Sequence, residues 1–279
     1  MNILLPTDFS DNAWNAISYA IDFFKKERCN FYLIHVSRMD NFMAGDSSYL
    51  PTADQIDDLY IKPAKRKLRT VLKTISDRQQ NNENHNFYTL TDYGFFLDSI
   101  RKHVEEKKID SIVMGTKGAS GLKEYILGSN TGDVITKVKC TTLVVPECAR
   151  YSELKEIAFP SDFDLSYDIQ ILQPLTNILR SSKSSLRIVH IHKKDTSLNL
   201  EQNNNKDLLN DYFEDFNPSL HFLTNKKVED AIQCFVESRA IDMIVMVAKN
   251  LNYFKNILFH SKIEKITYHT DIPFLVLHE

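Results

Sequence analysis

Glycine is scarce in this chain: the 279 residues include only seven, and the last 147 residues contain none. Cysteine is scarce too, and the four cysteines stand apart with no C-x-x-C pair. In a chain of this size, such spacing argues against a disulfide framework and favours reduced thiols, as in a cytosol. The amino terminus turns polar at Thr7 and Asp8, so no signal peptide is visible.

Long apolar runs and an excess of positive charge are also missing. No run approaches the roughly 20 residues that a membrane span needs, and the net charge of −3 argues against a dedicated nucleic-acid binder. We interpret the densest basic cluster as a solvated helix face; it consists of Lys62, Lys65, Arg66, Lys67, Arg69 and Lys73. We therefore expect a soluble cytoplasmic protein with neither a membrane nor a nucleic acid as partner.

The few glycines lie together. Five of the seven fall between Gly115 and Gly132, directly after an apolar run at 109–114 that is typical of a buried parallel strand. Glycine lets a backbone turn sharply or approach a ligand, and the start of a helix offers unpaired N–H groups and a positive dipole end. For any single glycine a structural turn is the better interpretation, but the spaced set favours a phosphate-binding loop.

The spacing is not that of two common nucleotide motifs. Neither G-x-x-x-x-G-K-[ST] nor G-x-G-x-x-G after a first strand occurs; what occurs is Gly115-x2-Gly118-x9-Gly128-Ser129. Ser129 suits the N-cap of the following helix and could give its hydroxyl to a phosphate or to a metal bound to one. Asp8 could cap a turn, but Ser10 and Asp11 already are candidate caps, which leaves Asp8 for a ligand.

The two halves of the chain repeat one another. Ile3–Ser10, Phe31–Val36 and Ile109–Met114 reappear as Ile157–Asp164, Leu186–Ile191 and Ile241–Met246. Such self-similarity indicates one domain in two copies, which we place at residues 1–149 and 150–279.

Each half alternates short β-branched runs with longer amphipathic segments. In the first half we expect strands near 2–6, 30–36, 86–90, 110–115 and 142–146, and helices near 11–27, 53–79, 95–107 and 129–139. This alternation predicts an α/β fold, a parallel sheet with helices on both faces.

Several motifs together resemble the universal stress protein family. They are the glycine spacing, the opening Ile3-Leu-Leu-Pro-Thr-Asp-Phe-Ser10, His35-Val36 and the closing Leu143-Val-Val-Pro146. The duplication resembles the family's tandem two-domain members. The resemblance implies two Rossmann-like, open five-stranded parallel sheets of the adenine nucleotide alpha hydrolase-like type, with strand order 3-2-1-4-5. It also implies ATP at the carboxyl ends of strands one and four, where ligands of open α/β sheets bind.

The site residues of the family carry over by position. Asp8 would contact the adenosine, with Pro6 and Thr7 beside it, and Val36 would meet the adenine, partly through its backbone. Met114 and Gly115 would line the ribose and phosphate side. The phosphates would be held by Gly118, Gly128, Ser129 and Asn130. The ligand would be ATP, ADP or AMP, with or without Mg²⁺.

The second half has lost the glycines of this loop. A constant offset places Val247 at Gly115, Asn250 at Gly118, Tyr253 at Gly121 and His260 at Gly128, and only Ser261 is kept, opposite Ser129. Valine is a poor replacement where the backbone must touch a ligand. We therefore predict that the second domain, although it retains Asp162, does not bind ATP in the family manner.

The remaining candidate chemistry is weak. No Ser–His–Asp order or carboxylate pair can be tied to the loop, so no catalytic residue is identified. His190-x-His192 has strand spacing, but no third metal ligand is near, and we interpret both histidines as structural. The apolar closing strands suggest that the two domains pair as an intramolecular pseudo-dimer, with a homodimer as a further option.

We therefore expect a nucleotide-binding regulatory or adaptor protein of the stress response, with one nucleotide in the first domain and an unidentified protein partner. A slow ATPase or phosphotransferase, and a nucleotide-independent interaction module, are the two alternatives.

Overall fold

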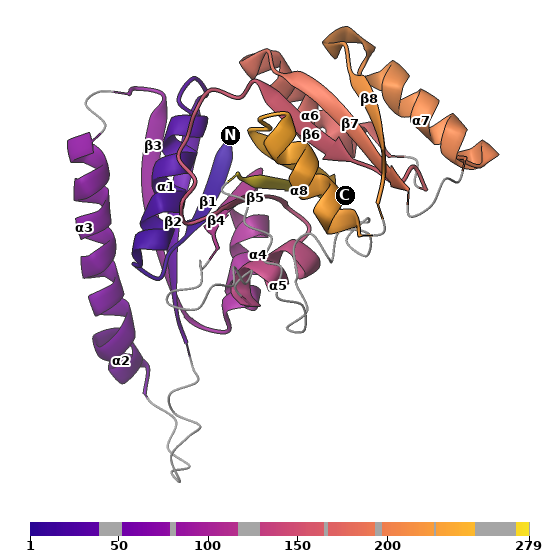
Figure 1. Cartoon of the computed structure of the whole chain (residues 1–279). Coiled ribbons are helices and arrows are strands. Elements are labelled where there is room, and N and C mark those ends of the chain that lie inside the picture. The colour runs from indigo at the N-terminus through magenta and orange to yellow at the C-terminus, as the bar shows by residue number, and fades with distance from the viewer. Residues whose placement is uncertain are drawn as a thin grey trace. The chain divides into compact units, whose positions relative to one another are not determined.

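The computed structural model describes residues 1–38, 52–78, 82–116, 129–164, 167–192, 197–225, 227–248 and 272–278. The chain divides into two compact units (Figure 1). Unit 1 consists of residues 1–115 and 129–140, and unit 2 consists of residues 116–128 and 141–279. The predicted ligand residues Gly118 and Gly128 lie outside the described residues, as do Asn250 and His260 of the second repeat.

Unit 1 contains the first four strands of the first repeat and their helices. In chain order these are β1 (Asn2–Pro6), α1 (Asp11–Phe23), β2 (Cys29–Arg38), α2 (Ala53–Ile56), the π-helical turn η1 (Asp57–Ile61), α3 (Lys62–Arg78), β3 (His85–Gly94), α4 (Phe96–Glu106), β4 (Ser111–Gly115) and α5 (Ser129–Lys137). The strands are parallel and lie in the order β3-β2-β1-β4. The predicted strands and helices of this region are confirmed to within a few residues.

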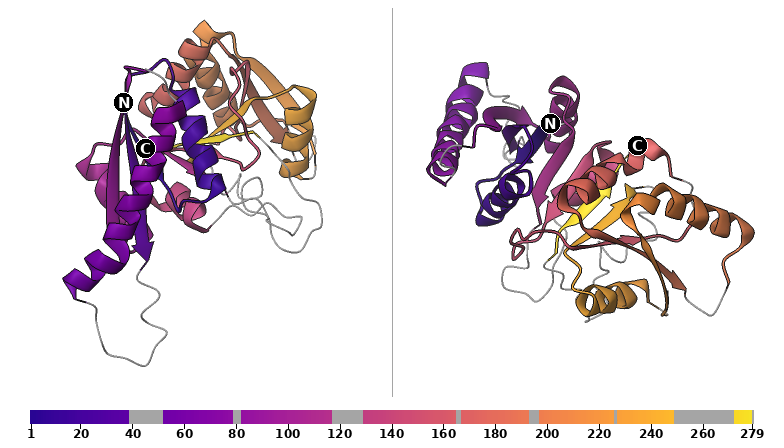
Figure 2. Two further views of the ribbon diagram at one scale, coloured as in Figure 1. Left: turned by 90° about the vertical axis from the view of Figure 1, so that its left-hand side faces the viewer. Right: turned by 90° about the horizontal axis from the view of Figure 1, so that it is seen from above.

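The sheet of unit 1 is buried on both faces. Leu4, Ile34 and Ile112 pack with residues of α4 and α5 in one cluster, while the alternate residues Ile3 and Leu5 are equally buried. Neighbouring strand residues point to opposite faces, so both faces are covered, with α1 and α3 on one side and α4 and α5 on the other (Figure 2). This explains why the strands read as continuous apolar runs.

Unit 2 contains the second repeat together with the last strand of the first. Its elements are β5 (Thr141–Val145), β6 (Glu156–Pro160), α6 (Ile169–Ser182), β7 (Ser185–His192), α7 (Leu200–Tyr212), the 3₁₀ turn η2 (Glu214–Phe216), β8 (Ser219–Thr224), α8 (Val228–Ser238), β9 (Met243–Val247) and β10 (Phe274–Leu277). The strands lie in the order β5-β10-β9-β6-β7-β8.

The second repeat thus reads β8-β7-β6-β9-β10, which confirms the predicted order 3-2-1-4-5. The two closing strands pair with each other: β10 runs antiparallel to β5, with Phe274 opposite Val144 and Val276 opposite Thr142. Because β5 belongs to the compact unit of the second repeat, the division in space does not follow the repeat boundary of the sequence, which stays a prediction at 149/150.

The first helices of the two repeats start at different places. Helix α1 begins at Asp11, shortly after β1 ends at Pro6, and Ser10 caps it by accepting a hydrogen bond from the Ala13 N–H. In the second repeat the loop after β6 is longer, and α6 begins only at Ile169 with Asp168 as its N-cap.

Candidate functional site

The turn that follows β1 is held by its own side chains. The Thr7 N–H donates to the Ile34 carbonyl at 2.9 Å and so extends the ladder between β1 and β2. The Thr7 hydroxyl accepts from the Phe9 N–H at 3.0 Å, and Phe9 has a left-handed backbone with φ of 67°. A bulky residue adopts this conformation only where the surroundings impose it. The turn at the carboxyl edge of the sheet is therefore held in place by specific contacts.

Asp8 has a structural role in this turn. Its Oδ1 accepts a hydrogen bond from the Ser10 N–H at 3.0 Å and another from the Ser10 hydroxyl. From the sequence, Ser10 was expected to cap the helix and so to leave the Asp8 carboxylate for a ligand. Ser10 does cap α1, but the Asp8 carboxylate accepts hydrogen bonds from Ser10. The Asp8 side chain is nevertheless exposed at the sheet edge, so a ligand could still meet its carboxylate.

His35 supports the same turn from the neighbouring strand. Its Nδ1 donates to the Thr7 carbonyl at 2.8 Å, and its ring lies 4.5 Å from the Phe9 ring, centroid to centroid. On the other face of β2, the half-buried Val36 packs against the core cluster that includes Met114. Because both hydrophobic side chains serve the core, their backbone is the part best able to meet a ligand at the edge.

Gly115 ends β4 where α1 passes close by. A Cβ atom at this position would lie 2.7 Å from Asn12 Oδ1 and 2.9 Å from the Asn12 carbonyl oxygen. Such distances are shorter than real Cβ contacts, so the fold itself requires glycine here. The sequence did not reveal this contact, because Asn12 and Gly115 are far apart in the chain.

Helix α5 is tied to the end of β4. The Thr131 hydroxyl donates to the Gly115 carbonyl at 3.0 Å, which fixes the first turn of α5, with Ser129 and Asn130, beside the strand end. This contact, too, was missed in the sequence, although Thr131 lies within the glycine-rich stretch. The side chain of Ser129 lies outside the described residues.

The second repeat keeps the turn. The Ser161 N–H donates to the Val189 carbonyl at 2.9 Å, Phe163 has a φ of 58°, and His190 Nδ1 donates to the Ser161 carbonyl at 2.9 Å. These contacts match those of Thr7, Phe9 and His35 one for one. The turn is thus a property of the repeat and does not by itself indicate a ligand.

In the second repeat, side chains of helix α7 hydrogen-bond to that turn. Gln202 Nε2 donates to the Asp162 carbonyl at 3.0 Å and to Asp164 Oδ1 at 2.9 Å. Asn205 Nδ2 donates to the Phe163 carbonyl at 2.8 Å. Two amide side chains therefore hydrogen-bond to three acceptor atoms of the turn, which an incoming ligand would otherwise contact.

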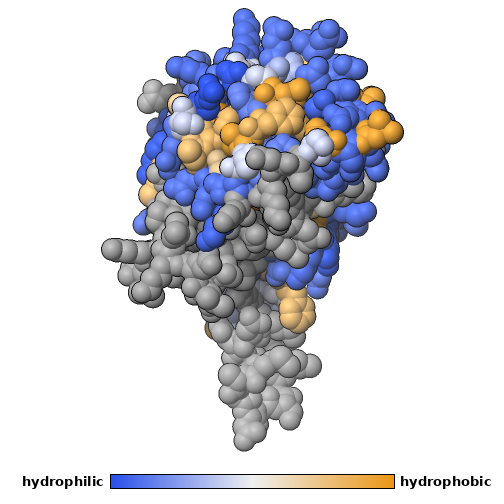
Figure 3. Space-filling model, turned by 45° about the vertical axis from the view of Figure 1, so that its right-hand side comes forward, coloured by the Kyte–Doolittle hydropathy of each residue, from blue (hydrophilic) through white to orange (hydrophobic). Residues whose placement is uncertain are grey.

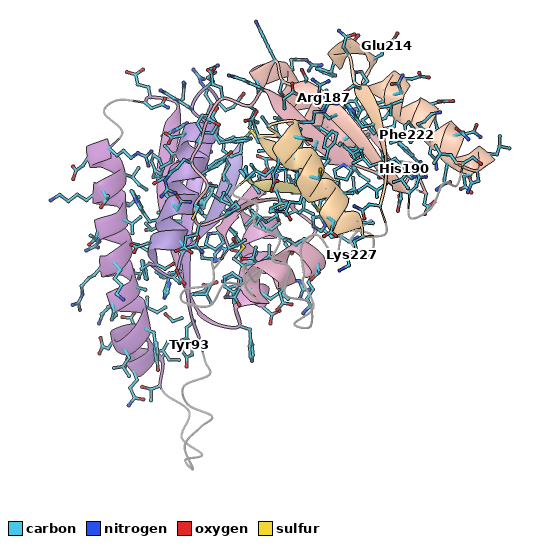
Figure 4. All side chains as sticks on the ribbon, viewed as in Figure 1. Tyr93, Arg187, His190, Glu214, Phe222 and Lys227 are labelled. Atoms are coloured by element: carbon cyan, nitrogen blue, oxygen red, sulfur yellow. The ribbon has the colours of Figure 1, made fainter. Side chains whose placement is uncertain are left out.

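The histidines of β7 lie in an aromatic cluster. The His190 and His192 ring centroids are 4.4 Å apart, and Phe222 of β8 lies 5.9 Å from each (Figure 4). Among the described residues, no three histidine, cysteine or acidic side chains gather in a way that could hold a metal ion. Both rings pack in this cluster, and His190 also donates to the Ser161 carbonyl.

Burial of His190 makes the stability of unit 2 sensitive to acid. Burial, aided by the nearby His192, lowers the pKa of His190 below its ordinary value. As pH falls below about 6.5, the unfolded chain therefore binds a proton before the folded one, and the free energy of unfolding decreases. We expect a His190→Gln variant, whose amide can still donate to Ser161, to show a shallower decrease in denaturant titrations followed by circular dichroism between pH 7 and 5. An unchanged slope would contradict this assignment.

The repeated, doubly wound α/β sheets define the class of protein. The sequence model of the Universal stress protein family matches residues 1–146, more than half of the chain, and the chain belongs to that family. No helix in the described parts of the chain is long and apolar enough to cross a membrane.

Relatives agree with this assignment. Universal stress protein MJ0531 of Methanocaldococcus jannaschii is 32% identical over 145 residues, which cover 51% of this chain and 80% of that protein. Universal stress protein MJ0577 of the same organism is 29% identical over 155 residues, 51% of this chain and 93% of that protein. A solved universal stress protein from Archaeoglobus fulgidus DSM 4304 matches 99% of this chain and 97% of its own with a TM-score of 0.69; at 18% identity it supports the fold alone.

Proposed function

We propose that the first repeat binds an adenine nucleotide at the carboxyl ends of β1 and β4, and that the protein acts as a regulatory or adaptor protein of the stress response. The observation that carries the proposal is the tie between Gly115 and Thr131, which holds the amino end of α5 beside the edge of the sheet. Strands β1 and β4 are neighbours in register, so Asp8 follows the adjacent strand at that same edge. Family membership supports the proposal.

The proposed contacts divide between the two parts of the nucleotide. Asp8, after Pro6 and Thr7, meets the adenosine, and the Val36 backbone meets the adenine. Met114 and Gly115 lie on the ribose side. The phosphates are bound by Gly118, Gly128, Ser129 and Asn130, since unpaired N–H groups at a helix start bind anions. ATP is the favoured ligand; Mg²⁺ would arrive with its phosphates.

The second repeat is proposed to bind no nucleotide in this way. Val247, which is fully buried, stands at the position of Gly115, and Gln202 and Asn205 already hydrogen-bond to the turn that would face the adenosine. Residues 1–149 would thus be the nucleotide domain. Residues 150–279 would be a scaffold or partner surface, joined to the first repeat as a pseudo-dimer through the pairing of β5 and β10.

The stoichiometry of binding tests the proposal. We expect the purified full-length chain to bind one adenine nucleotide, measured by isothermal titration calorimetry with ATP and by native mass spectrometry. Two nucleotides per chain would contradict the loss of the second site. A chain that binds none, and gains no thermal stability from added ATP, would instead favour a nucleotide-independent interaction module. Release of phosphate from labelled ATP separates the regulator from a slow ATPase.

A further inference from the structure

The helices that join the second and third strands of the two repeats carry opposite charge. In unit 1, α3 has seven basic residues and one acidic residue, Asp77. In unit 2, the segment of α7 and η2 has five acidic residues and one basic residue, Lys206. A solvated helix face, which the sequence suggested for α3, does not by itself explain why the equivalent helix has the reverse charge.

The basic residues of α3 form a stripe with few internal partners. Lys65, Arg69 and Lys73 follow one another at intervals of four residues, and therefore lie on one face of the helix, with Arg66 beside them. All four are exposed, and no ion pair is formed by them within the described parts of the chain. We call these four residues the basic stripe.

The outward face of α7 and η2 combines acid with exposed leucine. Leu200 is 80% exposed and Leu208 is 62% exposed, and Figure 3 shows apolar side chains among hydrophilic ones on this side of the molecule. The acidic residues of this face are exposed, and only one of them forms an ion pair among the described residues, Asp207 with the adjacent Lys206. They are Glu201, Asp207, Asp211, Glu214 and Asp215. We call these residues and the two leucines the acidic face.

We propose that the basic stripe of one copy of this chain docks on the acidic face of a second copy. Lys65 and Lys73, and likewise Asp207 and Asp215, are eight positions apart in the chain, about 12 Å at the rise of an α-helix, so the charges can face one another over a similar length. The long lysine and arginine side chains have aliphatic stems that can cover Leu200 and Leu208. A second copy also gives the acidic face a partner, which a membrane or a nucleic acid bound to the basic stripe would not.

The contact joins two different surfaces, the basic stripe of one copy and the acidic face of the next. Two copies can make this contact reciprocally in a closed pair, or successive copies can make it in rings or open chains. Since the charges are solvent-exposed, their attraction is weak and screened by salt. The association is therefore expected at low ionic strength and high protein concentration.

Charge reversal on the full-length chain tests this docking. The basic stripe is reversed in a Lys65→Glu, Arg69→Glu, Lys73→Glu variant, and the acidic face in an Asp207→Lys, Asp211→Lys, Glu214→Lys variant. A control variant, Lys25→Glu, Lys26→Glu, Arg28→Glu, makes the same charge change at exposed positions that belong to neither the basic stripe nor the acidic face. Sedimentation at about 20 mM and about 500 mM salt measures association, and circular dichroism verifies the fold of each variant.

We expect the native chain and the control to self-associate at low salt, and either reversed variant to do so at least about tenfold more weakly. Mixing the two reversed variants should restore association, because the acidic helix of one then faces the basic helix of the other. The proposal is overturned if the native chain stays monomeric at all concentrations, as it would if the two surfaces met within one molecule, or if the mixture fails to associate. It is also overturned if the control weakens association as much as the reversed variants do.

Discussion

A Gly118→Val variant is expected to lose nucleotide binding while it keeps its fold. In the family resemblance this glycine lets the loop backbone approach the phosphates, and a valine side chain would occupy that space and restrict the backbone. At a hundredfold excess of ligand over the dissociation constant, binding stabilises a protein by about 2.7 kcal/mol. The variant should lose this entire increment and keep its stability without ligand.

The single tryptophan makes the measurement specific. Trp14 lies in α1 of unit 1, so its fluorescence during thermal or denaturant unfolding reports on the unit that holds the proposed site. The matched control is Asn250→Val, the same change at the aligned position of the second repeat, which should leave the effect of ATP untouched. If ATP still stabilised the Gly118→Val protein, the loop would not be part of the nucleotide site.

Replacement of Gly115 is expected to damage the fold of unit 1 before any question of ligand arises. In Gly115→Ala the new methyl group would meet Asn12, whose carbonyl oxygen lies 2.9 Å from the Cβ position. Either α1 or the end of β4 must shift, and overpacking of this kind costs about 1–3 kcal/mol. Unfolding followed by Trp14 fluorescence should show this loss in the absence of nucleotide.

The aligned position of the second repeat provides the opposite control. Val247 is fully buried at the end of β9, so Val247→Ala removes buried methyl groups, leaves a cavity and should cost about 2 kcal/mol. Removing the Asn12 side chain in Asn12→Ala/Gly115→Ala should recover part of the loss at Gly115, because Oδ1 forms the shortest contact. If Gly115→Ala proved as stable as the native chain, the close packing of α1 would not be the reason for glycine.

These two results separate the roles within the glycine cluster. The absence of glycine from the second repeat could be explained by loss of a ligand alone. For Gly115, however, the structure supplies another cause: α1 begins close to β1, whereas α6 begins later and β9 ends in a buried valine. Gly118 is therefore the cleaner test of nucleotide binding, and Gly115 is a test of packing.

Much of the fold could be predicted from the sequence. Apolar runs mark the strands because both faces of the sheet are buried, and the repeat fixes where each run recurs. The helix start at Ser10 was also predictable, since a serine cap is a local signal. By contrast, the hydrogen bonds of Asp8 to Ser10 were not predicted, because they depend on the left-handed turn at Phe9.

By itself, then, the sequence determined the repeated α/β plan and the position of a glycine-rich loop after the fourth strand. Both follow from local patterns of polarity and backbone freedom. Only the tertiary structure showed that a side chain at position 115 would collide with Asn12. It also showed that Thr131 ties α5 to the end of β4, and that Gln202 and Asn205 hydrogen-bond to the turn after β6 in the second repeat. Each of these depends on residues distant in the chain, which meet because parallel strands bring their carboxyl ends to one edge.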